Sequence, residues 1–151
     1  MKAVYDFNQK RNEFKLNEEL ERDMLVEEIK EFYDATKLAE RIDAMIDVNF
    51  VYDGTIMKYN YNGMVVPEET TKIYAQFRQI AKEVVIEELG DDAQYFDKIM
   101  QSAWQIVCDI NSQKTTNLRE NGKVDKQADL PNATERIQEM LDSLLTEEKA
   151  E

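Results

Sequence analysis

Acidic side chains recur at helical spacing between residues 27 and 47. They form two groups separated by a short joint, and the members of each group stand mostly three or four residues apart. In a helix such steps place side chains on one face. If the two helices pack antiparallel, the acidic faces meet, and clustered carboxylates repel one another unless a cation lies between them. The spacing therefore predicts a metal site. The two groups are Glu27, Glu28 and Glu31, and Glu40, Asp43 and Asp47.

The residue types in the chain restrict which metal this site could hold. The sequence has no histidine and a single cysteine, Cys108. Ser-His-Asp and Cys-His catalytic sites are therefore excluded, and so are the Glu-x-x-His pairs of di-iron carboxylate bundles. A zinc site would have to combine one cysteine with carboxylates, which zinc rarely uses. The remaining ligands are oxygen atoms, and these suit Mg²⁺, Mn²⁺ or Ca²⁺.

The second acidic group is harder to explain as ordinary surface than the first. A Glu-x-x-Glu pair on a helix usually belongs to a solvated face. Asp43 and Asp47, in contrast, fall among apolar residues at helical spacing, such as Ile42 and Ile46. Aspartate is a mediocre helix former and is costly to bury without a partner. Both aspartates therefore call for an explanation, and a bound cation supplies one.

Composition predicts an all-α protein. A chain of 151 residues fits one domain, residues 1–151, and is long enough for a substantial core. Helix breakers are scarce, with 4 glycines and 2 prolines. We therefore expect an antiparallel helical bundle.

Charge and hydropathy argue against several kinds of partner. The net charge of −13 disfavours broad contact with nucleic acid or an anionic membrane. No apolar run approaches the roughly 20 residues of a membrane span, and no signal peptide is visible. A single cysteine excludes an internal disulfide, so a reducing cytoplasm is the expected location.

Apolar periodicity places the acidic groups on the second and third of six expected helices. Asn17 is expected to cap the second helix, Pro67 to open the fourth, and Gly90 to end it. A polar loop is expected over residues 115–131. The expected helices span about residues 4–13, 18–35, 36–59, 67–89, 91–111 and 132–148.

Other residues mark local features of these helices. Thr36 is a possible cap of the third helix, and Asn132 or Thr134 can cap the last one. Gly54 lies inside the third helix, where it indicates a kink or the close approach of a neighbouring helix.

The acidic motifs and three downstream pieces, taken in order, resemble a known family. The acidic motifs are Glu27-Glu28-x-x-Glu31-Phe32 and Glu40-x-x-Asp43-Ala44-x-x-Asp47-x-x-Phe50-Val51. The downstream pieces are Trp104-Gln105-Ile106-Val107, Asn111-Ser112-Gln113-Lys114 and Asn121-Gly122-Lys123-Val124-Asp125-Lys126. Over about residues 20–131 the chain resembles the MazG-like all-α nucleoside triphosphate pyrophosphohydrolases. It is most similar to the small phosphoribosyl-ATP pyrophosphohydrolase-like proteins of bacteriophages and bacteria.

The resemblance implies an activity and a set of site residues. Members of this family bind Mg²⁺, for which Mn²⁺ is a possible substitute, and cleave nucleotides between the α- and β-phosphates to give a monophosphate and pyrophosphate. Homodimers or homotetramers are usual, and a bacterial or phage-infected host cytoplasm is the expected location. The implied metal ligands are Glu28, Glu31, Glu40, Asp43 and Asp47. The implied catalytic residues are Glu27, Glu28 and Glu31, with Glu27 orienting a water, and the implied substrate contacts are Asn111, Lys114, Lys123 and Lys126.

The chain departs from the family pattern at Ala44. If Asp47 is the family's final aspartate, Ala44 replaces the glutamate three residues earlier, and Asp43 stands one step away. If Asp43 is that aspartate, Glu40-x-x-Asp43 fits as written and Asp47 is an additional ligand. The sequence leaves both registers open.

Ala44 also keeps a second class of function open. A helical binding or inhibitor protein could keep the scaffold without turnover, and its acidic surface would suit a basic partner. A third possibility is the same chemistry on an alarmone or on phosphoribosyl-ATP. The aromatic residues do not indicate which base would be recognised.

Overall fold

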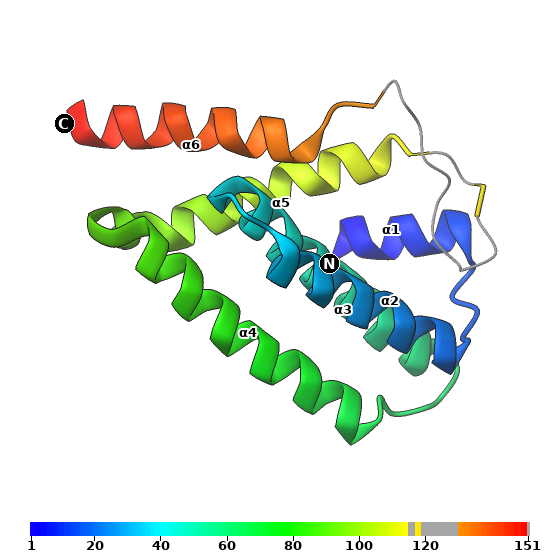
Figure 1. Cartoon of the computed structure of the whole chain (residues 1–151). Helices are drawn as coiled ribbons and strands as arrows, with labels where there is room; N and C mark the ends of the chain where they lie inside the picture. The colour runs from blue at the N-terminus through cyan, green and yellow to red at the C-terminus, as the bar shows by residue number, and fades with distance from the viewer. Residues whose placement is uncertain (115–116, 119–129, 151) are drawn as a thin grey trace.

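The computed structural model describes residues 1–114, 117–118 and 130–150. Within these residues the chain forms six α-helices and one short 3₁₀ helix, as predicted for an all-α protein (Figure 1). The helices are α1 (Lys2–Arg11), α2 (Glu18–Asp34), α3 (Leu38–Tyr61), α4 (Glu68–Leu89), η1 (Gly90–Tyr95), α5 (Phe96–Ser112) and α6 (Ala133–Ala150).

Helix α3 is the centre of the fold. It contacts α1, α2, α4, α5 and α6, and its most extensive contacts are with α2. Apolar side chains on several sides of α3 are buried, among them Ile42, Met45 and Val48. A helix that is apolar on more than one side is stable only when neighbours cover it, so the other helices are arranged around α3.

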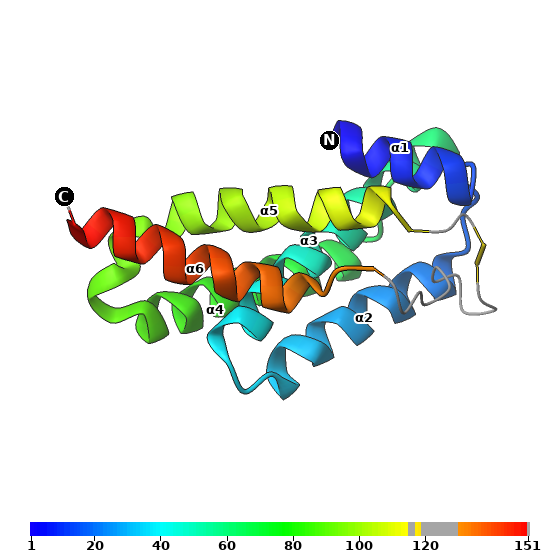
Figure 2. The same ribbon diagram turned by 90° about the horizontal axis from the view of Figure 1, so that it is seen from above.

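The second half of the chain reverses direction twice, first between α4 and α5 and then between α5 and α6. Gly90 ends α4 with a φ of +57°, a conformation that glycine adopts without the steric cost that other residues incur. The chain then passes through η1 into α5, and α6 returns antiparallel beside α5 (Figure 2). Lys98 on α5 pairs with Glu148 on α6, and Lys149 pairs with Asp92 at 3.4 Å, so the end of α6 is joined to η1 and α5.

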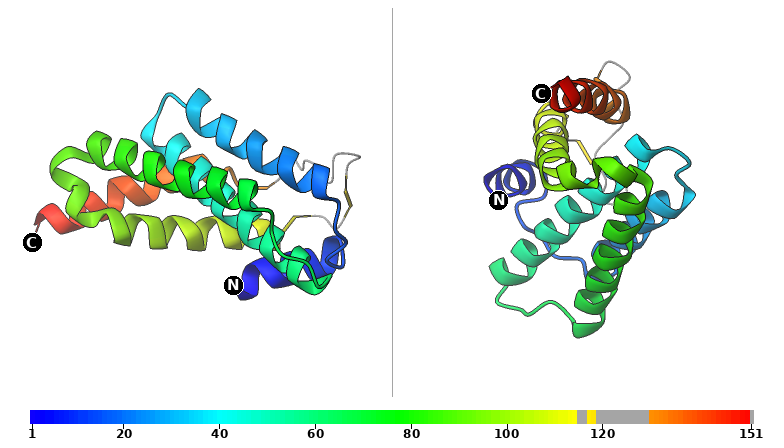
Figure 3. Two further views of the ribbon diagram at one scale, coloured as in Figure 1. Left: turned by 90° about the horizontal axis from the view of Figure 1, so that it is seen from below. Right: turned by 90° about the vertical axis from the view of Figure 1, so that its left-hand side faces the viewer.

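Helix α1 lies at the edge of the bundle (Figure 3) and contacts α3 and α5. Gly54 of α3 faces this helix. A Cβ atom at Gly54 would lie 2.9 Å from Nδ2 of Asn8, which is too close for an ordinary contact. The glycine predicted to mark a kink or a close approach therefore marks a close approach.

The helix caps agree with the sequence in most places. Asn17 accepts a hydrogen bond from the Leu20 amide at 3.1 Å and begins α2. Asn132 accepts one from the Glu135 amide at 3.2 Å and begins α6. Thr36 was the wrong cap for α3, because Lys37 occupies that position.

A buried ion pair lies between α2 and α3. The Lys58 ammonium pairs with the Glu21 carboxylate, and the two side chains are 7% and 5% exposed. The Thr55 hydroxyl donates to the second oxygen of Glu21 at 2.8 Å, so both carboxylate oxygens have partners. Buried charges are tolerated when they are paired and hydrogen-bonded in this way.

No helix among the described residues combines the length and the apolar character that crossing a membrane requires. The polar loop predicted for residues 115–131 lies mostly outside the described part of the chain.

Candidate metal site

The α2–α3 hairpin brings the two acidic groups together. Residues 35–37 join the helices, and Arg41 fixes this joint by donating to the Ala35 carbonyl at 3.2 Å. Arg41 also forms an ion pair with Glu88 of α4 at 2.6 Å. The same side chain therefore connects the joint to α4. The two helices run antiparallel (Figure 2), which is the condition under which the acidic faces can meet.

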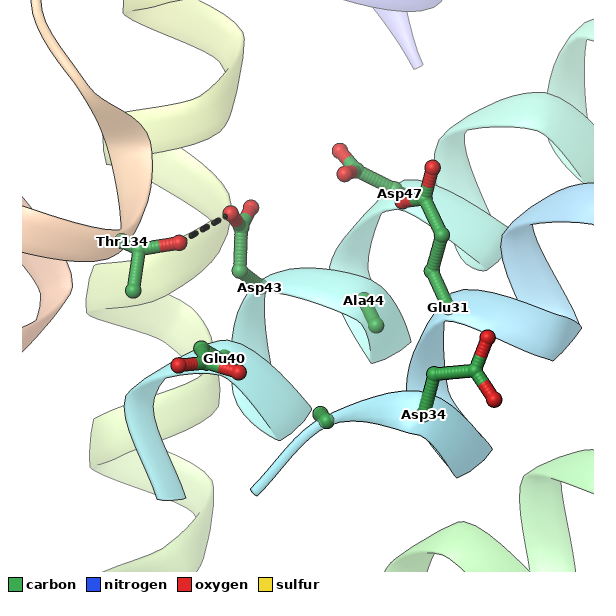
Figure 4. A pocket seen from close by; sticks show the side chains of 8 residues that line it. Glu31, Asp34, Glu40, Asp43, Ala44, Asp47 and Thr134 are labelled. Carbon is green, nitrogen blue, oxygen red and sulfur yellow. Dashed lines mark hydrogen bonds between the residues drawn. The ribbon is translucent and has the colours of Figure 1, made fainter. Parts of the chain in front are cut away.

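Three carboxylates meet across this hairpin and could hold a metal ion. Oxygen atoms of Glu28, Glu31 and Asp47 all lie within 4.8 Å of one another. Figure 4 shows Glu31 extending from α2 toward Asp47 on α3. Glu28 is only 9% exposed, whereas Glu31 is open to solvent. The group therefore extends from the protein interior to the surface, and an ion could enter from the Glu31 side.

A pocket of about 280 Å³ opens beside this carboxylate group. Its walls come from α2, α3, the joint between them and the first turn of α6. The lining residues are Glu31, Asp34, Ala35, Glu40, Asp43, Ala44, Asp47 and Thr134. Most of these side chains end in oxygen, which suits a hard cation with part of its water shell retained.

Burial and mutual repulsion disfavour charge on the two aspartates. Burial raises the pKa of Asp47 well above its ordinary value, and the negative charges of Asp43 and Glu28 raise it further. Burial likewise raises the pKa of Asp43, although a hydrogen bond from Thr134 lowers it. A divalent cation would reverse this balance, because it favours the ionised carboxylates.

Asp43 has one oxygen engaged and one without a partner. Its Oδ2 atom accepts a hydrogen bond from the Thr134 hydroxyl at 2.8 Å (Figure 4). Its Oδ1 atom is buried and has no hydrogen-bond partner among the described residues. A buried acceptor without a donor costs free energy, and a nearby cation or its water would satisfy it.

Lys114 is a basic residue whose charge acts on these carboxylates. It follows α5 and is half-buried, and its positive charge lowers the pKa of both Asp43 and Asp47. Asn111, three residues earlier, is 7% exposed. The charge of Lys114 therefore acts on the candidate site, while Asn111 is largely enclosed at the end of α5.

Other predicted site residues have different positions. Glu27 is solvent-exposed and belongs neither to the three-carboxylate group nor to the pocket lining. Glu40 lines the pocket, and its carboxylate accepts a hydrogen bond from the Thr36 amide at 3.3 Å. Lys123 and Lys126 lie outside the described residues.

The two aspartates of the second acidic group have different surroundings. Asp47 joins Glu28 and Glu31, whereas Asp43 lies one turn away in contact with Thr134. Ala44 lines the pocket three residues before Asp47, where the family pattern has a glutamate. Both aspartates line the same pocket, so both registers stay open.

Thr134 lines the pocket, as do Asp34 and Ala35, and none of the three was predicted from the sequence as a site residue. Thr134 was considered only as a helix cap, and Asn132 has that role instead. Its partner Asp43 is 91 residues away in the chain. No local pattern could have connected the two residues.

No family model, no curated protein and no solved structure matches this chain.

Proposed function

We propose that this protein is a Mg²⁺-dependent nucleotide pyrophosphohydrolase. Its substrate would be a (deoxy)nucleoside triphosphate or a related nucleotide, cleaved between the α- and β-phosphates to a monophosphate and pyrophosphate. The observation that supports this best is the group formed by Glu28, Glu31 and Asp47, whose oxygens lie within 4.8 Å of one another. The resemblance of the acidic motifs to the MazG-like family points to the same chemistry.

The donor set fits a hard divalent cation. Glu28, Glu31 and Asp47 would be its ligands, and Asp43 would accept from water around it. All of these donors are carboxylate oxygens, the ligands that Mg²⁺ and Mn²⁺ prefer. When bound, Mg²⁺ would neutralise phosphate charge and make water a stronger nucleophile at neutral pH.

The chain itself would supply the remaining interactions. Lys114 carries a positive charge beside the acidic group, where it would pair with a phosphate oxygen of the substrate. Glu27 lies on α2 one turn before Glu31 and would orient the attacking water as a general base. Asn111, Lys123 and Lys126 are the further candidates for contacts with phosphate or sugar.

The decisive experiment measures pyrophosphate release. Purified protein is incubated with Mg²⁺ and a panel of nucleotides that includes an alarmone and phosphoribosyl-ATP, and pyrophosphate and orthophosphate are quantified separately. Glu31→Gln and Asp47→Asn should abolish turnover. Asp34→Asn is the matched control, because Asp34 lines the same pocket but lies outside the three-carboxylate group. Retained turnover in Asp47→Asn would refute the ligand assignment.

A binding or inhibitor protein on the same scaffold is the second candidate. Ala44 favours it, since this residue presents a methyl group to the pocket where the family pattern has a carboxylate. Calorimetry separates the two candidates, because a protein that binds Mg²⁺ or Mn²⁺ gains thermal stability from it. No shift with either metal, together with no hydrolysis, would favour the binding role.

A further inference from the structure

The last residue of α1 connects that helix to the end of α5. Arg11 is 9% exposed, and its Nη2 atom donates to the carbonyl of Asn111 at 3.1 Å and to that of Lys114 at 2.7 Å. Its Nη1 atom donates to the Phe7 carbonyl at 3.2 Å, and its guanidinium lies over the Phe7 ring, 4.0 Å from the centroid. One side chain therefore joins two helix ends that are about a hundred residues apart in sequence.

An arginine is well suited to this position. The last carbonyls of a helix lack intrahelical donors, and the C-terminal end of a helix carries partial negative charge. Burial lowers the pKa of the Arg11 guanidinium, but arginine stays protonated in proteins. The planar guanidinium can donate to two carbonyls in a fixed geometry, whereas a lysine ammonium is a compact charge on a flexible stem and lacks that fixed geometry.

The carbonyls that Arg11 contacts belong to the turn that carries Lys114. After α5 ends, the Gln113 amide donates to Ile110 at 3.0 Å and the Lys114 amide donates to Asn111 at 3.2 Å. These are local hydrogen bonds at a helix terminus, where fraying is common. The bonds from Arg11 to the Asn111 and Lys114 carbonyls are long-range contacts that hold this turn.

We propose that Arg11 is a positioning residue that holds Lys114 beside the carboxylate group of the candidate site. Its functional consequence rests on the proposed metal site, because Lys114 would otherwise have no phosphate to meet. The geometric part, that Arg11 fixes the turn at residues 111–114, stands without it.

The first test uses amide hydrogen exchange on the metal-free protein. In Arg11→Met, exchange at the amides of Gln113 and Lys114 should become at least about tenfold faster, because the turn loses its tertiary contact. Val4→Ala is the matched control, since Val4 is a fully buried residue of α1 with no role in that turn. Unchanged exchange in Arg11→Met, or an equal increase in Val4→Ala, would overturn the proposal.

The second test asks whether Arg11 acts through Lys114. A positive charge beside the carboxylates repels a divalent cation, so Lys114→Met should bind Mn²⁺ about three- to tenfold more tightly. Arg11→Met should show part of this increase in Mn²⁺ affinity. Arg11→Lys should show an increase comparable to that of Arg11→Met, because the lysine keeps the positive charge but is not expected to bond both carbonyls. In the Lys114→Met background, Arg11→Met should have little further effect. Additive effects would refute the coupling.

The two tests fail for different reasons. If the wild-type protein binds no Mn²⁺, the proposed metal site and the functional part of this inference both fail, and hydrogen exchange decides the geometric part alone. If Mn²⁺ binds and the cycle is non-additive but no pyrophosphate is released, the positioning role stands and the proposed reaction is refuted.

Discussion

Asp47→Asn should stabilise the metal-free protein while removing its response to metal. The wild-type chain holds three carboxylates with oxygens within 4.8 Å of one another. At that separation and an effective dielectric constant of about 20, two ionised carboxylates repel by about 3 kcal/mol. Solvent screens the exposed Glu31, and partial protonation relieves some of the remaining repulsion. We therefore expect a net gain of about 1–3 kcal/mol in unfolding free energy at pH 8.

The assay is thermal unfolding with a chelator and then with saturating Mn²⁺. For a chain of this length, 1 kcal/mol corresponds to about 2–4 °C, so the melting temperature of metal-free Asp47→Asn should rise by roughly 2–12 °C. Wild-type protein should gain about 2.7 kcal/mol from Mn²⁺ at one hundred times its Kd, and the variant should lose most of that gain.

Asp34→Asn is the control for this prediction. Asp34 lines the same pocket, but its partner Lys30 makes a solvent-exposed pair with it at 2.7 Å. Its loss should change the unfolding free energy by less than about 0.5 kcal/mol. The reasoning would be wrong if Asp47→Asn were less stable than the wild type without metal, or if it kept the full Mn²⁺ response.

Three other perturbations have defined outcomes. Because burial raises the pKa of Asp43 and of Asp47, the folded state binds more protons than the unfolded chain above about pH 4. This extra proton binding stabilises the folded state. The stabilisation is complete at low pH and is lost as the pH rises through the raised pKa values of the two aspartates. Thermal unfolding with a chelator should show a shallower decline in Asp47→Asn than in wild type, and equal slopes would contradict this. Glu21→Gln leaves the buried Lys58 ammonium without its counter-charge and should cost about 3–5 kcal/mol in urea unfolding; a loss below about 1 kcal/mol would show that the pair is dispensable. Ala44→Glu adds a carboxylate to the pocket lining, so it should tighten Mn²⁺ binding in calorimetry and destabilise the metal-free protein. Unchanged Mn²⁺ affinity would show that position 44 does not face the ion.

The α2–α3 hairpin could be predicted from sequence because its signals are local. Asn17 caps α2 through a bond to Leu20, three residues away, and the helical steps between acidic residues fix which of them share a face. Packing then determined which part of the acidic face turns inward. Glu28 became buried and Glu27 stayed exposed, a distinction that depends on how α2 rotates against α3.

Contacts between distant segments could not be predicted. The hydrogen bond from Thr134 to Asp43 and the bonds from Arg11 to the end of α5 join residues about ninety to a hundred positions apart. A threonine near a helix start and an arginine near a helix end are each explained by local chemistry alone. Their actual partners depend on how α1 and α6 dock, which no local pattern in a single sequence specifies.

The three carboxylates of the candidate site come from one continuous segment, which has a consequence for design and divergence. Residues 18–61 contain both helices and their joint, so the candidate cation site lies within a single module that could be grafted onto another helical bundle. Lys114 and Thr134 enter from separate segments. Substitutions at the end of α5 or the start of α6 can therefore change the surroundings of this carboxylate group while Glu28, Glu31 and Asp47 stay as they are.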